Sequence, residues 1–109
     1  MGRATTIAQE AGVRVGLGSD LIGPDQTFRG LELVLRSGID GPMSALISAT
    51  RINAEILGLA DQIGTVEVGK VADLVAFDGD PLEEPKLFND RDRVALVVQS
   101  GKVVKNLRA

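Results

Sequence analysis

The sequence predicts an α/β fold in two successive parts. In the first part, apolar residues recur mainly at helical spacing, and one short segment alternates between apolar and other residues as a strand does. The pattern changes after Gly58, where short β-rich segments are separated by glycines. We therefore expect an α/β part at about residues 1–59 and a β part at about residues 60–109.

The first part is expected to contain helices around one strand. Residues 5–11 predict a helix, and Gly12 follows it, as glycine commonly does just past a helix end. Residues 13–18 alternate with period two and predict a strand, followed by a loop at 21–26 that contains glycine and proline. Three further helices are predicted at 27–37, ended by Gly38; from Pro42, a preferred first helical residue; and at about 53–57, ended by Gly58.

The second part is expected to be mainly β-structure. Its predicted segments are a glycine-punctuated β segment at 63–70, a strand at 72–77 closed by 78–81, a charged loop at 82–92, and strands at 94–99 and 102–105. Ser100-Gly101 separates the last two strands and predicts a two-residue hairpin turn.

The composition excludes several classes of function. The 109 residues include no His and no Cys, which rules out disulfides, zinc fingers, thiol nucleophiles and a Ser-His-Asp triad. The net charge of −3 argues against a nucleic-acid partner, and three Phe without Trp or Tyr offer few stacking platforms. Because no apolar run approaches the length of a membrane span, we expect a soluble, cytoplasmic chain without a membrane partner.

Asp20, at the end of the predicted strand, is the candidate functional residue. Alternation places Val13, Val15 and Leu17 on one face and Arg14, Gly16, Gly18 and Asp20 on the other. The two glycines leave room for a ligand beside Asp20. Catalytic groups in α/β proteins commonly follow the carboxyl ends of strands. The alternative is that Asp20 caps a turn or the next helix, and the pattern alone leaves both interpretations open.

Other polar segments are weaker candidates. The glycines at 64 and 69 do not form a phosphate loop, because the Lys-Ser/Thr ending and a following helix are missing. Asp78 and Asp80 match no calcium-loop spacing. The alternating charges at 90–93 indicate a solvated patch.

Six segments, in order, resemble parts of the amidohydrolase superfamily, with prolidase and imidazolonepropionase-like members the most similar. These are 12–20 (GVRVGLGSD), similar to the eighth barrel strand; 42–46 and 49–58, similar to the helices that follow; 63–75, similar to the re-entry into a small β-sandwich; and 78–82 and 98–103, similar to its last strands. The resemblance implies the last strand and helices of a (β/α)8 metal-dependent hydrolase barrel, followed by the C-terminal strands of a β-sandwich, here as a fragment.

The resemblance also implies a role for Asp20. Superfamily enzymes hold one or two divalent metals, often zinc, on several His and on an Asp at the end of strand eight. That Asp binds metal and takes a proton from the attacking water. Asp20 alone matches this ligand set, so it is expected to be a metal ligand and a general base.

The missing histidines limit what the chain can do alone. A metal site needs three or four ligands, and one Asp cannot hold a catalytic zinc. We therefore expect the C-terminal part of an enzyme that hydrolyses an amide, cyclic amide or dipeptide C–N bond. The isolated chain is expected to be inactive and without bound metal. Its expected partner is the missing N-terminal barrel portion or a second copy, with a small-molecule substrate only in the complete enzyme. The alternative is a non-enzymatic module that self-associates or completes a partner chain.

Overall fold

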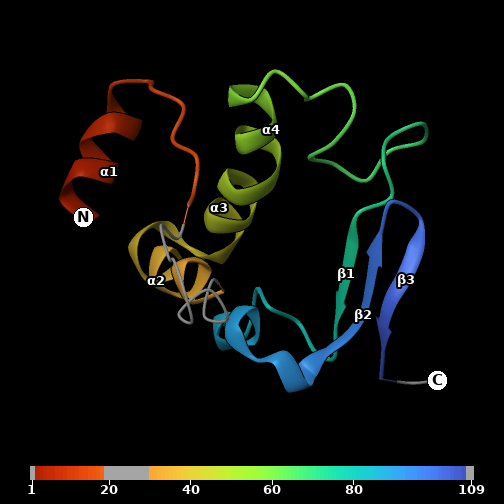
Figure 1. The fold of residues 1–109 in the computed structure, drawn as a ribbon. Helices are drawn as coiled ribbons and strands as arrows, with labels where there is room; N and C mark the ends of the chain where they lie inside the picture. Colours follow the sequence, from red (N-terminus) through yellow and green to blue (C-terminus); the bar gives the residue numbers. More distant parts are fainter. Residues whose placement is uncertain (1, 19–29, 108–109) are drawn as a thin grey trace, which may run out of the picture.

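The computed structural model describes residues 2–18 and 30–107 of the chain. The helices gather on one side of the molecule, and a three-stranded sheet lies on the other (Figure 1). The helices are α1 (Gly2–Glu10), α2 (Leu31–Asp40), α3 (Pro42–Ile47), η2 (Ser48–Ile52), α4 (Asn53–Ile56), η3 (Pro85–Asn89) and η4 (Arg91–Arg93), and the strands are β1 (Leu74–Phe77), β2 (Val94–Gln99) and β3 (Lys102–Asn106).

Glycine and proline residues mark most of the helix boundaries in the first part. Gly12, just beyond α1, has a φ of 79°, and Gly58, just beyond α4, has a φ of 73°. The prediction that Gly38 ends the second helix is wrong: α2 runs through it to Asp40. The break falls instead at Gly41, whose φ of 95° precedes the proline that starts α3.

The two separate helices predicted after α2 form one continuous helix. The α3, η2 and α4 segments follow one another without a break from Pro42 to Ile56. Five residues at its centre, Ser48–Ile52, have π-helical hydrogen bonding. The whole helix runs beside the segment at 13–18, which is where the candidate site lies (Figure 1).

Two predicted β segments are not strands in the structure. Residues 13–18 pair with no strand among the described residues, and a side-chain amide bonds their backbone instead. Residues 63–70 form turns and irregular structure. They are held by the ammonium of Lys70, which donates to the carbonyl oxygen of Ala60 at 2.6 Å and to Oγ1 of Thr65 at 2.7 Å, and lies 2.8 Å from Glu67. Alternation and β propensity predict an extended chain, whereas a strand also needs a neighbouring strand.

The sheet confirms the strands predicted at 94–99 and 102–105 and the hairpin between them, and the strand predicted at 72–77 is observed as the shorter β1. Its order is β1-β2-β3, and both pairs are antiparallel. Ser100 and Gly101 form the turn between β2 and β3 with φ values of 51° and 80°, as a tight hairpin turn of the type I′ class requires. The charged loop expected at 82–92 contains the short 3-10 helix η3 and leads into η4.

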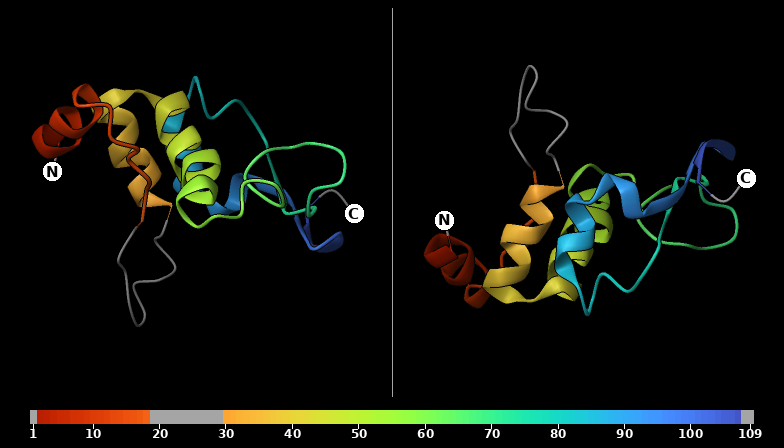
Figure 2. Two further views of the ribbon diagram at one scale, coloured as in Figure 1. Left: turned by 90° about the horizontal axis from the view of Figure 1, so that it is seen from above. Right: turned by 90° about the horizontal axis from the view of Figure 1, so that it is seen from below.

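The core of the described residues is small. The buried apolar residues are Ala45, Ala54, Leu87, Phe88 and Ala95. Phe88 meets Phe77 edge to face, with ring centroids 5.8 Å apart, and so joins η3 to β1. Figure 2 shows from above and below that the sheet lies beside the helices rather than under them. Among the residues that the structure describes, seventeen large apolar side chains are consequently more than a third exposed.

Across the described residues, no helix is both long and apolar enough to cross a bilayer. The described residues form an α/β structure with a small antiparallel sheet.

Candidate functional site

A network centred on a buried ion pair connects the helices to the segment at 13–18. Arg36, on α2, is only 4% exposed, and its Nε lies 3.1 Å from both carboxylate oxygens of Asp40, one turn further along the helix. The guanidinium also donates to Oγ of Ser48 at 3.0 Å and to the carbonyl oxygen of Gly16 at 3.4 Å. One side chain thus connects α2, the π-helical segment η2 and the segment at 13–18.

Asp40 is the second centre of this network. Its Oδ2 accepts hydrogen bonds from Nε2 of Gln9 at 2.7 Å and from Oγ of Ser44 at 2.8 Å, which brings in α1 and α3. Burial by itself raises the pKa of Asp40. The hydrogen bonds from Gln9, Ser44 and Arg36, together with the positive charge of Arg36, outweigh burial and hold the pKa below its ordinary value of 3.8. Asp40 is therefore a charged structural carboxylate at neutral pH.

Asn53 forms a second link between the helix and the segment. Its Oδ1 accepts from the N–H of Leu17 at 2.9 Å, and its Nδ2 donates to the carbonyl oxygen of Leu17 at 2.8 Å. A Cβ at Gly16 would lie 2.1 Å from Oδ1 of Asn53 and 3.1 Å from Cδ1 of Ile56. Only glycine therefore allows this close approach.

This contact corrects one prediction about the face that carries Gly16. That face was expected to leave room for a ligand, but Asn53 and Ile56 fill the space at Gly16. At Gly18, by contrast, no described atom lies within 4 Å of an added Cβ. Asp20 itself lies outside the described residues, so its expected place beside these glycines stays a prediction.

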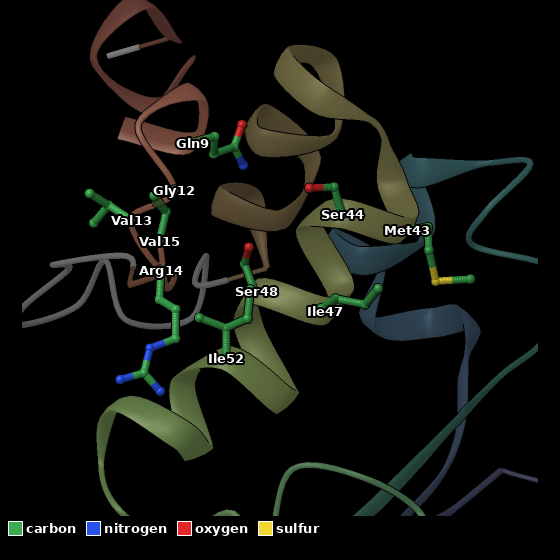
Figure 3. Close-up of a pocket in the computed structure, with 10 residues that line it drawn as sticks. All are labelled: Gln9, Gly12, Val13, Arg14, Val15, Met43, Ser44, Ile47, Ser48 and Ile52. Carbon is green, nitrogen blue, oxygen red and sulfur yellow. The ribbon is translucent and has the colours of Figure 1, made fainter. Parts of the chain in front are cut away.

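An open groove of about 520 Å³ runs between residues 12–15 and the long helix (Figure 3). Figure 3 shows Val13, Val15 and Arg14 on one side of it and Ser48 and Ile52 on the other. The groove is lined by Gln9, Gly12, Val13, Arg14, Val15, Met43, Ser44, Ile47, Ser48 and Ile52. Such a lining is suited to packing and carries no constellation of catalytic groups.

The described residues do not fit a metal ion by themselves. Nowhere in 2–18 or 30–107 do three His, Cys, Asp or Glu residues come together as a metal site would require. Two carboxylates of the second part have structural partners instead. Asp73 accepts from the backbone N–H of Ser100 at 2.8 Å. Hydrogen bonds from Lys70 and Thr65 lower the pKa of Glu67, an exposed turn residue.

The sequence did not reveal Arg36, Asp40 and Asn53 as site-forming residues. The first two are spaced four apart on an apolar helix, which is a recognisable signal for an ion pair. Asn53 and Leu17 are 36 residues apart in the chain, and no local pattern predicts their contact.

Known proteins resemble this chain in sequence and in fold. The model of the amidohydrolase family matches residues 3–104, and the chain therefore belongs to that family. It is 37% identical over 97 residues to an imidazolonepropionase of Acinetobacter baumannii (strain AB0057), a match that covers 85% of this chain and 24% of that protein. A solved prolidase complexed with N-methylphosphonate-L-proline superposes with a TM-score of 0.89 at 40% identity, covering 96% of this chain and 26% of that one.

The chain thus spans about a quarter of the length of the relatives that it matches. The family is metal-dependent, and a similar solved structure, an adenosine deaminase from Xanthomonas campestris, contains bound zinc. That structure shares 27% identity and a TM-score of 0.62, and the match covers 92% of this chain and 27% of that one.

Proposed function

We propose that the chain is the C-terminal part of a metal-dependent amidohydrolase that hydrolyses an amide, cyclic amide or dipeptide C–N bond. The observation that carries the proposal is the family match over residues 3–104, combined with relatives about four times as long. The similar prolidase structure and the imidazolonepropionase sequence support a C–N bond as the target. In this proposal, residues 1–59 end a barrel domain and residues 60–109 belong to a β-sandwich domain.

Asp20 is the residue that would carry chemistry in this part. It would provide one carboxylate ligand to a metal centre, zinc in the first instance, whose other ligands lie outside this chain. When bound, such a metal would supply a water molecule of lowered pKa, and the role of the Asp20 carboxylate would be to accept a proton as a general base. The described residues supply a scaffold for the chain shortly before Asp20 in the sequence, in which α2 and the long helix hold residues 16 and 17.

The test is an isosteric substitution in the full-length protein that contains this segment. Asp20→Asn should abolish turnover of an amide or dipeptide substrate and lower the metal content, while the far-ultraviolet circular dichroism stays unchanged. Asp61→Asn, at an exposed turn position, is the matched control and should retain activity. Turnover that survives Asp20→Asn would refute the assignment.

A second candidate function is a non-enzymatic module that self-associates or completes a partner chain. The exposed apolar side chains favour it, because a small folded protein seldom leaves so many uncovered. Both outer strands of the sheet also have an edge that pairs with no described strand. Light scattering should then give a mass above 11.5 kDa at high concentration. A clean monomer at every concentration would count against this candidate. The cytoplasmic location expected from the sequence stays a prediction.

A further inference from the structure

The segment at 13–18 is held by side chains from two different helices. We propose that Asn53 and Arg36 are positioning residues, which fix the backbone of Gly16 and Leu17 and thereby set the place of the carboxylate that follows. The functional meaning of this inference rests on the proposed role of Asp20, which is the third residue after Leu17 in the sequence.

Asn53 binds Leu17 as a residue on a neighbouring strand would. Paired residues in an antiparallel ladder exchange two N–H to carbonyl hydrogen bonds, and the Asn53 amide supplies the equivalent acceptor and donor at 2.9 and 2.8 Å. The orientation of the amide is defined, because Nδ2 also donates to the carbonyl oxygen of Ala49 at 3.3 Å. Turning the amide over would place oxygen against two carbonyl oxygens and nitrogen against an N–H.

Arg36 binds the peptide group that joins Gly16 to Leu17, on the side opposite Asn53. In an extended chain, the carbonyl of one residue and the N–H of the next point in opposite directions. The Gly16 carbonyl, which accepts from Arg36, and the Leu17 N–H, which donates to Asn53, are such a pair. Arg36 is itself fixed by Asp40 and Ser48, so this contact comes from a rigid group.

The position of Gly16 makes the arrangement intolerant of displacement. A methyl group there would overlap Oδ1 of Asn53, so a Gly16→Ala substitution would move the amide away from Leu17 without altering Asn53. Two chemically different substitutions, Asn53→Leu and Gly16→Ala, should therefore have the same local effect. Asn53→Leu keeps a branched side chain of similar size but removes both the acceptor and the donor that face Leu17.

The experiment measures backbone amide hydrogen exchange in the ¹⁵N-labelled chain by NMR. Exchange at Leu17 should accelerate by at least about tenfold in Asn53→Leu and in Gly16→Ala, since both hydrogen bonds to Leu17 are lost. The amides of β2, which lie outside the network, should keep their rates. Thr50→Val is the matched control: it removes a bond from the Thr50 hydroxyl to the Leu46 carbonyl on the same long helix, and should leave Leu17 unchanged.

The second readout is the amide signal of Asp20. It should shift in both test variants and not in Thr50→Val. Unchanged exchange at Leu17 in either test variant, or equal acceleration across β2, would overturn the proposal. Accelerated exchange at Leu17 with an unmoved Asp20 signal would equally refute the positioning role. Neither readout needs metal or substrate, so the result is independent of the Asp20→Asn activity test.

Discussion

Removal of the Arg36 guanidinium should cost much of the stability of the chain. Arg36→Met keeps an unbranched side chain of similar length but removes the contacts with Asp40, Ser48 and Gly16. Breaking a buried ion pair from one side typically costs about 3–5 kcal/mol, because the other charge is left without its partner. The Asp40 side chain is 16% exposed and keeps its bonds from Gln9 and Ser44, so we expect the lower end, about 3 kcal/mol.

Urea unfolding followed by circular dichroism measures this free energy. Arg51→Met is the matched control: Arg51 is 55% exposed and lies 3.7 Å from Glu55, so its loss should cost less than about 0.5 kcal/mol. In the double variant Arg36→Met/Asp40→Asn, no unpaired charge remains and the amide oxygen can still accept from Gln9 and Ser44. That variant should recover about 1–2 kcal/mol. If Arg36→Met were no more destabilising than Arg51→Met, the network would not hold the helices together.

Three further predictions concern pH and backbone conformation. The pKa of Asp40 is lower in the folded state than its ordinary value of 3.8, so the stabilisation by the charged carboxylate is complete above pH 3.8 and is lost as the pH falls through the folded pKa. Asp40→Asn should therefore weaken the loss of stability in acid, measured by urea unfolding at a series of pH values. An unchanged pH dependence would contradict this prediction. Gly64→Ala should destabilise by more than about 2 kcal/mol, because φ is 99° and the new Cβ would lie 2.6 Å from that of Ala54; a loss below about 0.5 kcal/mol would show that the turn is not fixed there. Ser100→Asn should raise the melting temperature by about 2–4 °C, since Asn suits the left-handed position of the hairpin turn, and a lower melting temperature would speak against that turn type.

The sequence predicted the elements whose signals are local. The turn at Ser100-Gly101, the helix start at Pro42 and the helix end before Gly58 all depend on residues with special backbone preferences. The prediction that the second helix ends at Gly38 was wrong because a glycine is tolerated inside a helix whose packing is favourable, at a cost of about 1 kcal/mol. The stronger signal was the glycine-proline pair three residues later.

The elements that failed depend on partners distant in the sequence. Residues 13–18 have the alternation of a strand, but ladder partners are not encoded in the segment itself. The candidate site shows the same division. The choice of Asp20 depends on its position after an alternating segment and stays a prediction, whereas the contact between Asn53 and Leu17 depends on how the long helix folds back over the chain. Gly16 was interpreted as space for a ligand, and the structure shows that Asn53 occupies it.

The central claim is that this chain supplies one ligand to a metal site whose other ligands lie elsewhere. The most direct measurement is elemental analysis of the purified 109-residue chain after dialysis against zinc, paired with an amide-hydrolysis assay on the same sample. We expect substoichiometric zinc and no turnover. Stoichiometric zinc together with turnover by the isolated chain would contradict the claim.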